Sequence, residues 1–201
     1  MSANGTMTEQ DIQARKETLR REALARRDAI APEQRAALSA QIVLQIAAVI
    51  AERRPRYVAA YASIRSEVDT LALLDLMIEQ SSVACLPAVI GERMVFRSWT
   101  PGSPLKPGPL GAPEPPAEAA EVMPDLVVAP VAAFDRQGGR LGYGHGFYDK
   151  AVAALRAEGR AVWLVGAAFG VQQVDTIPLE PHDIPLDLIA TESETIVLRA
   201  G

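Results

Sequence analysis

The chain has 201 residues, a formal net charge of −5, one cysteine and two histidines. A hydrophobic fraction of 49% at this length suits one globular domain and excludes disorder as the overall state. The single Cys85 excludes a disulfide framework and a multi-cysteine zinc site. The acidic balance argues against nucleic acid as a main partner.

Two further patterns concern the membrane. The sequence has no charge-free apolar run of the roughly 18 residues that a membrane span needs. Its N-terminus also lacks the basic-then-apolar pattern of a secretory signal. We therefore expect a cytoplasmic protein without a membrane partner, and we expect it to act as a monomer.

The predicted elements begin with two helices. Residues 1–7 are small and polar, and we expect them to be flexible. The first helix is predicted from Thr8, which forms a capping box with Asp11, to about residue 28. Pro32 suits the first turn of a second helix, whose apolar residues recur at a 3.6-residue period to about residue 52.

The rest of the chain alternates between strands and helices. Short apolar runs predict strands at 57–62, 83–89, 94–99, 126–131, 162–169, 186–191 and 195–198, and two more helices are predicted at about 71–80 and 147–158. Residues 101–116 are so rich in proline and glycine that we expect a surface loop without regular structure. This order predicts an α/β fold: a single domain over residues 8–201, with a mostly parallel central sheet flanked by helices on both faces.

The strongest chemical signal is a glycine-rich segment at residues 138–150, GGRLGYGHGFYDK. Glycine loses the most conformational entropy on folding, so this density indicates positive φ angles or close contact with a ligand. The segment follows a predicted strand and opens a helix, where free N–H groups and the helix dipole bind anions. A long flexible turn is the alternative, although such a turn would not need the large apolar residues between the glycines.

The spacing does not assign this loop to a known type. No Gly-Lys-Ser/Thr closes it, so it is not a Walker A loop. It also lacks the G-x-G-x-x-G spacing of the dinucleotide fingerprint. On the residues alone, it is a phosphate-binding loop of unassigned type.

Two aspartates are candidate magnesium ligands. Asp149 is predicted in the first turn of the helix after the loop, where it either balances the helix dipole or binds Mg²⁺ beside phosphate oxygens. Asp183 lies on an irregular segment and is the weaker candidate.

Four other charged residues invite a functional interpretation. Lys16 and Arg20 are neighbours on one helix face, where they either bind an anion or belong to a solvated surface. Asp69 is the predicted N-cap of the following helix, which is a sufficient structural reason for it. Glu67 is not explained by capping, and it could accept hydrogen bonds from the ring N–H and amino group of a pterin-like heterocycle.

Taken together, these residues resemble the 5-formyltetrahydrofolate cyclo-ligase family. The match keeps its order and spacing from about residue 16 to residue 192, and the run from Arg140 to Asp149 is its most specific part. The other matching segments are Lys16-x-x-x-Arg20, residues 67–70, residues 130–135, residues 182–187 and Thr191-Glu192.

The resemblance implies an ATP- and magnesium-dependent cyclisation of 5-formyltetrahydrofolate to 5,10-methenyltetrahydrofolate with release of ADP and phosphate. The formyl oxygen would be phosphorylated and N10 would then attack the formyl carbon. No catalytic residue is assigned, although Lys16, Arg140 and His145 would be placed to stabilise charge.

The resemblance also implies binding roles by position. Asp149 and Asp183 would hold magnesium. The folate site would be lined by Ile64, Glu67, Asp69 and Tyr148. The ATP-binding residues would be Lys16, Arg20, Arg140, Leu141, Gly142, Tyr143, Gly144, His145, Gly146, Phe147 and Tyr148.

The sequence departs from the family pattern at three positions. Tyr143 and His145 stand where some members carry Arg or Lys, and Lys150 stands where Arg is frequent. A histidine replaces a fixed cation only in part, because its charge depends on pH. Two other functions stay open: a non-catalytic folate- or nucleotide-binding paralogue, and a different small-molecule kinase or ligase that uses the same loop.

Overall fold

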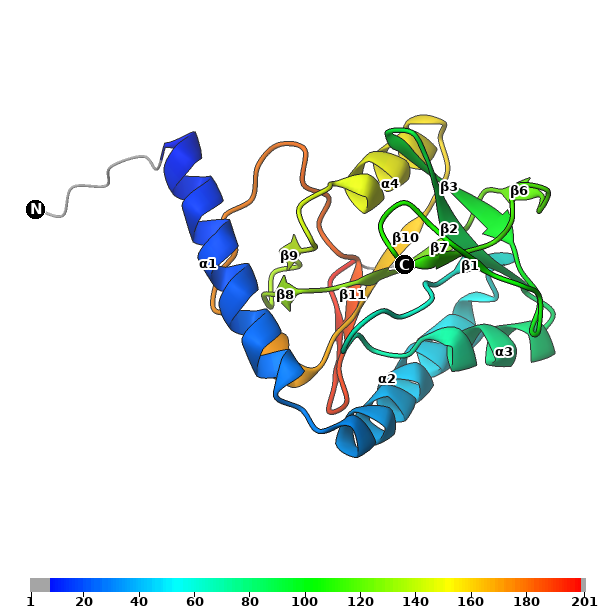
Figure 1. Cartoon of the computed structure of the whole chain (residues 1–201), viewed down its shortest axis with the longest axis horizontal. Coiled ribbons are helices and arrows are strands. Elements are labelled where there is room, and N and C mark those ends of the chain that lie inside the picture. Colours follow the sequence, from blue (N-terminus) through cyan, green and yellow to red (C-terminus); the bar gives the residue numbers. More distant parts are fainter. Residues whose placement is uncertain (1–7, 200–201) are drawn as a thin grey trace, which may run out of the picture.

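The centre of the fold is an eight-stranded sheet, seen in a computed structural model that describes residues 8–199 (Figure 1). The strands in spatial order are β12 (Thr195–Val197), β11 (Leu188–Ala190), β10 (Trp163–Ala167), β7 (Leu126–Pro130), β1 (Tyr57–Ala59), β2 (Val83–Ile90), β3 (Arg93–Ser98) and β6 (Glu121–Val122). The strands from β11 to β2 run parallel, and the others pair antiparallel. The expected α/β fold is confirmed, while the flexible segment expected at residues 1–7 lies outside the described residues.

Alternation along β7 shows why both faces of the sheet are covered. Successive side chains of a strand point to opposite faces. Leu126 and Val128 belong to the core shared with α2 (Pro32–Arg53) and α3 (Leu71–Glu79). Val127 and Ala129 belong to the core shared with α4 (Phe147–Ala157). Helices therefore lie on both faces, as expected, with α4 on the opposite side of the sheet from α2 and α3 (Figure 1).

The sequence of α2 explains its place in the core. Ile42, Ile46 and Ile50 are fully buried and lie four residues apart, so they form one stripe that faces the sheet. By length and composition α2 is also the one helix within residues 8–199 that could cross a membrane. In this fold its apolar stripe is packed inside the domain.

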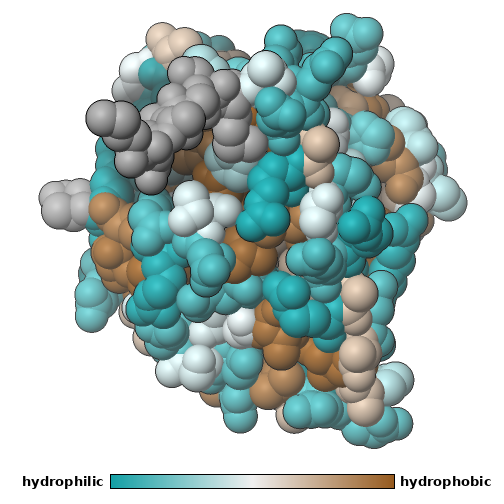
Figure 2. All heavy atoms as spheres, turned by 90° about the vertical axis from the view of Figure 1, so that its left-hand side faces the viewer, coloured by the Kyte–Doolittle hydropathy of each residue, from teal (hydrophilic) through white to brown (hydrophobic). Residues whose placement is uncertain are grey.

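The first helix, α1 (Glu9–Asp28), lies along one side of the domain (Figure 1). The predicted capping box between Thr8 and Asp11 is confirmed at its N-terminus. Leu19 and Ala23 pack against a small ribbon, β8 (Ala133–Phe134) paired with β9 (Arg140–Leu141). Figure 2 shows this side of the molecule as a mostly hydrophilic surface with smaller hydrophobic areas.

The proline-rich segment contains regular structure, so the expectation for residues 101–116 is wrong. There β4 (Lys106–Pro107) pairs with β5 (Pro113–Glu114) in a short antiparallel ribbon. The N–H of Gly111 donates to the oxygen of Gly108 at 2.9 Å, and Gly111 has φ +79°. Glycine adopts this turn conformation without strain, which lets the ribbon form between prolines. The strands β4, β5, β6, β8 and β9 have only two residues each, which is too short to produce a visible alternation of apolar and polar residues in the sequence.

The segment after β1 also differs from the prediction. The strand expected over residues 57–62 ends at Ala59. Beyond Ala59, the Thr70 hydroxyl makes the backbone hydrogen bonds that a neighbouring strand would otherwise make. It donates to the oxygen of Tyr61 at 2.7 Å and accepts from the N–H of Tyr61 at 3.3 Å. Thr70, not Asp69, is the N-cap of α3, and Asp69 accepts from the N–H of Leu71 at 3.2 Å.

Candidate active site at the carboxyl ends of the parallel strands

The chain crosses over in opposite directions from two neighbouring strands. From β1 it continues through α3 to β2 on one side, and from β7 it continues through α4 to β10 on the other. In open α/β sheets, ligands bind in the crevice that such a switch leaves beyond the carboxyl ends of the strands. The segments that follow β1 and β7 carry Glu67 and the glycine-rich loop, so both predicted sites meet there.

The glycine-rich loop borders a cavity of about 190 Å³, which we call the polar cavity. It is lined by Lys16 and Arg20 of α1, by Asp183, and by every residue from Arg140 to Asp149. The structure therefore brings together all the residues that the sequence placed at ATP and magnesium. They come from α1, from the loop, from the start of α4 and from the segment before β11.

The loop is held in place along its length. The Nε of Arg20 donates to the oxygen of Gly142 at 2.8 Å, and the N–H of Ala132 donates to the oxygen of Leu141 at 2.7 Å. Gly144 and Gly146 have φ values of +96° and +65°, which favour glycine. Gly146 is also the N-cap of α4 and offers no capping side chain, so the first amides of α4 stay open to an anion. These contacts argue against a flexible turn.

Lys16 belongs to the cavity and not to a solvated face. Its buried Nζ lies 2.7 Å from Glu180 Oε2 and 2.5 Å from Asp183 Oδ2. Burial lowers the pKa of Lys16, but its hydrogen bonds and charge interactions with Asp183 and Glu180 outweigh burial, and the net pKa is raised. Lys16 is therefore a fixed cation at neutral pH.

Asp149 joins three segments of the site. Its Oδ2 accepts from Arg140 Nη2 at 2.8 Å, and its Oδ1 accepts from the N–H of Ile184 at 3.0 Å. Arg140 is buried, and its Nε has no hydrogen-bond partner among the described residues. Asp149 thus does more than balance the dipole of α4.

The donor set of the polar cavity fits magnesium. Within residues 8–199 no group of three or more His, Cys, Asp or Glu side chains gathers as a metal site. Mg²⁺ typically takes one or two carboxylates and completes its octahedron with phosphate oxygens and water. Asp149 and Asp183 line the same cavity, and His182 Nε2 lies 3.8 Å from Asp183 Oδ1. Two carboxylates that line one cavity beside the glycine-rich loop match that preference.

A second cavity, of about 350 Å³, adjoins the first, and we call it the apolar cavity. Its walls are largely apolar or aromatic, and Ile64, Glu67 and Tyr148 are among the residues that line it. Asp69 lies outside both cavities, exposed and turned to the N-terminus of α3. The two cavities share the wall residues Met94, Leu110, Pro130, Tyr143, His145 and Tyr148.

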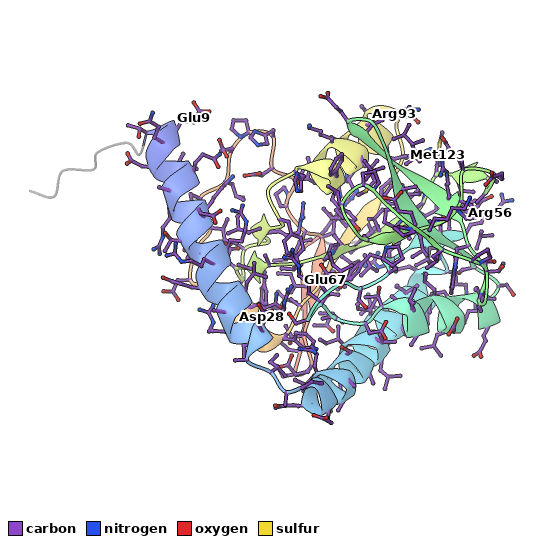
Figure 3. All side chains as sticks on the ribbon, viewed as in Figure 1. Glu9, Asp28, Arg56, Glu67, Arg93 and Met123 are labelled. Atoms are coloured by element: carbon purple, nitrogen blue, oxygen red, sulfur yellow. The ribbon has the colours of Figure 1, made fainter. Side chains whose placement is uncertain are left out.

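Glu67 is the buried carboxylate of the apolar cavity, and it lies in the interior between α1 and the sheet (Figure 3). It accepts from the N–H of Ile64 at 2.8 Å. Burial raises the pKa of Glu67, and the hydrogen bond from Ile64, the nearby Tyr143 hydroxyl and the charges of Arg27 and Arg65 lower it in part.

Several residues of the site were not found from the sequence. Glu180 contacts Lys16, and Tyr61 lines the apolar cavity with a buried hydroxyl that has no partner among the described residues. Leu110, from the ribbon between β4 and β5, lines both cavities. Glu180 could have been found from the sequence, because it forms an acidic pair with Asp183, three residues further on. Tyr61 and Leu110 belong to the site through tertiary contacts that no local pattern encodes.

The chain is similar to known proteins over most of its length. Residues 12–192 match the model of the 5-formyltetrahydrofolate cyclo-ligase family. The 5-formyltetrahydrofolate cyclo-ligase of Escherichia coli K12 is 30% identical over 176 residues, which cover 84% of this chain and 96% of the relative. That of Haemophilus influenzae is 32% identical over 145 residues, which cover 69% of this chain and 76% of the relative.

The fold is similar as well. The NMR structure of Aquifex aeolicus 5,10-methenyltetrahydrofolate synthetase superimposes with a TM-score of 0.77 at 29% identity, covering 92% of this chain and 94% of that one. The predicted motifs, the fold and the relatives agree with one another. The chain therefore belongs to the 5-formyltetrahydrofolate cyclo-ligase family of enzymes.

Proposed function

We propose that the protein catalyses the ATP- and magnesium-dependent cyclisation of 5-formyltetrahydrofolate to 5,10-methenyltetrahydrofolate, with release of ADP and phosphate. The observation that carries the proposal is the pair of adjoining cavities with one shared wall. The polar cavity suits the phosphates of ATP, and the apolar cavity suits a heterocycle. A ligand in each would meet at the shared wall, where a phosphoryl group can pass between them.

The chemistry needs positioning and charge rather than a nucleophilic side chain. A formamide oxygen is a poor nucleophile and its carbon a poor electrophile. Transfer of the γ-phosphoryl group to the formyl oxygen forms an O–P bond and breaks the bond to ADP. N10 then attacks the formyl carbon, and phosphate departs with the oxygen. In phosphoryl transfer the protein mainly aligns the reactants and neutralises charge.

The residues of the polar cavity match these needs. Lys16, Arg20 and Arg140 bring positive charge to the phosphates, and the open amides at the start of α4 add hydrogen-bond donors. His145 lines both cavities and would add charge only when protonated. Asp149 and Asp183 would hold magnesium, which supplies positive charge beside the phosphates when it is bound.

The apolar cavity matches the folate. Apolar and aromatic walls bury a flat ring system, and a few polar groups fix its orientation. Glu67 would accept hydrogen bonds from the ring N–H and amino group of the pterin, while Ile64 and Tyr148 would contact the ring. Asp69 would act on this site only through the start of α3.

One assay tests the proposal. Purified protein, Mg²⁺, ATP and 5-formyltetrahydrofolate should yield the methenyl chromophore, and the yield should vanish when ATP or Mg²⁺ is left out. Folate binding without turnover would instead favour a non-catalytic paralogue. ATP hydrolysis driven only by another small molecule would favour a different kinase or ligase. A cytoplasmic location and a monomeric state are further proposals; sedimentation at assay concentrations tests the second.

A further inference from the structure

One arginine at the end of α1 is buried beneath the candidate site. Arg27 is 1% exposed, and its guanidinium reaches two segments that are distant in sequence. Its Nε donates to Ser66 Oγ at 3.0 Å, and its Nη2 donates to the Tyr143 hydroxyl at 3.1 Å. Its Nη1 is buried and has no partner among the described residues. Arg27 thus connects α1 with the loop after β1 and with the glycine-rich loop.

The burial of the charged Arg27 side chain needs a physical explanation. Taking a charge out of water is costly unless it is paired and hydrogen-bonded. The carboxylate recorded in an ion pair with Arg27 is that of Asp28, at 3.7 Å, and its side chain is largely exposed. One hydrogen bond of Arg27 ends on Tyr143, which lines both cavities, and the other ends on Ser66, between the cavity residues Arg65 and Glu67. Arg27 therefore contacts two of the segments that form the site.

Tyr143 is the point where these contacts reach both cavities. It lines the polar and the apolar cavity. Its ring lies near two guanidinium groups, 6.0 Å from Arg27 and 5.8 Å from Arg65. Its hydroxyl accepts from Arg27 and interacts with the nearby carboxylate of Glu67, whose pKa it lowers. A shift of Tyr143 would change the shared wall and leave Glu67 with fewer partners.

We propose, building on the folate site proposed above, that Arg27 is a positioning residue for the folate substrate. Its buried guanidinium fixes the Tyr143 hydroxyl and Ser66, and so holds Glu67 in the orientation that binds the pterin ring. ATP depends less on Arg27, because Arg20 holds the glycine-rich loop through Gly142.

The charge of Arg27 also acts on Glu67. The groups that face this carboxylate are Arg27 from α1, Arg65 from its own loop, Tyr143 from the glycine-rich loop, and the Tyr61 and Tyr148 hydroxyls. Burial raises the pKa of Glu67, and Arg27 opposes that rise. Without Arg27 the pKa rises further, and Glu67 loses its charge at a higher pH.

The test compares Arg27→Met with Arg26→Met, an exposed arginine on the same helix turn. Arg27→Met should raise the KM for 5-formyltetrahydrofolate roughly tenfold, since hydrogen bonds to charged groups carry about that factor. The KM for ATP should change by less than about threefold, because the loop keeps its other contacts. Arg26→Met should change neither value. Equal changes in both KM values, or none, would overturn the proposal.

A second variant keeps the test decisive if Arg27→Met does not fold. Tyr143→Phe retains the ring and removes only the hydroxyl, so it should raise the same folate KM by a smaller factor. In both variants the calorimetric affinity for 5-formyltetrahydrofolate should fall more between pH 7.5 and 5.5 than in the wild type. A merely structural role would lower affinity equally at both pH values, and that result would refute the inference. If the wild type binds no folate at all, the proposed function fails, and this inference fails with it.

Discussion

The two cavities share a wall but handle charge in opposite ways. In the polar cavity the cations face carboxylates: Lys16 contacts Glu180 and Asp183, and Arg140 contacts Asp149. In the apolar cavity Glu67 is a buried carboxylate whose pKa is raised by burial. Paired charges can be exchanged for those of a ligand, whereas a buried carboxylate with a raised pKa favours a ligand that donates hydrogen bonds. The contrast supports the proposal that phosphates and a metal bind in the polar cavity and a heterocycle binds in the apolar one.

Of these variants, a replacement of Asp149 should have the largest effect on turnover. Asp149→Asn keeps the size of the side chain but removes the charge that magnesium needs, so turnover should fall by roughly a hundredfold or more, with partial rescue at high Mg²⁺. Folate should still bind. The buried Arg140 loses its partner, so the free energy of unfolding should fall by more than the about 0.3–1 kcal/mol of a dipole contact.

Glu158→Gln is the control for Asp149→Asn, because Glu158 is an exposed carboxylate at the other end of α4. Turnover is measured at saturating substrates over a magnesium titration, with thermal unfolding followed in parallel. Near-normal turnover of folded Asp149→Asn at low magnesium would remove Asp149 from the metal site.

Gly144→Val tests whether the loop itself binds phosphate. A side chain at φ +96° is strained, and at this position it also enters the polar cavity. Gly159 has a similar φ of +80° but lies outside both cavities, so Gly159→Val is a matched control. Calorimetry should show ATP affinity reduced by roughly tenfold or more, about the effect of losing a charge-assisted hydrogen bond, in Gly144→Val alone. Unchanged affinity in a folded variant contradicts the phosphate-loop assignment.

Lys16→Gln should affect ATP and leave folate binding nearly intact. The variant removes a buried cation and leaves Glu180 and Asp183 without it. We expect the KM for ATP to rise roughly tenfold, as for the loss of a hydrogen bond between charged groups. Arg15→Gln, an exposed neighbour on the same helix, is the control. Wild-type kinetics in Lys16→Gln would show that this cation does not meet the nucleotide.

Glu67→Gln should have the smallest effect of these variants. We expect it as a change in thermal stability, which can be measured without a ligand. Because the folded-state pKa of Glu67 is raised, ionisation at rising pH costs stability, and the loss accumulates as pH rises through the folded-state pKa. Glutamine does not ionise, so the variant should melt higher than the wild type at pH 7 and about equally at pH 4. Each 1 kcal/mol corresponds to about 2–4 °C in Tm. A variant that melts lower at pH 7 would show that the carboxylate stabilises the fold; weaker folate binding is expected in either case.

Much of the fold followed from local patterns. The 3.6-residue period of α2, the capping box of α1 and the apolar run of β7 were each correct because a single element encodes them. The C-terminal end of β1 and the N-cap of α3 were predicted incorrectly. There the Thr70 hydroxyl binds the backbone of Tyr61, and this contact between two segments overrides the local preferences.

The candidate site divides in the same way. Local sequence was sufficient to find the run from Arg140 to Asp149, because glycines with positive φ, a strand before them and a helix after them are all local features. Only the tertiary structure decided that Lys16 lies against Asp183, that Arg27 is buried under Tyr143, and that Asp69 lies outside both cavities. These contacts join residues more than 100 positions apart, or depend on how one loop turns. The site lies beyond the ends of β1 and β7, from which the chain continues to opposite sides of the sheet. The periodicity of the sequence contains no information about such long-range contacts.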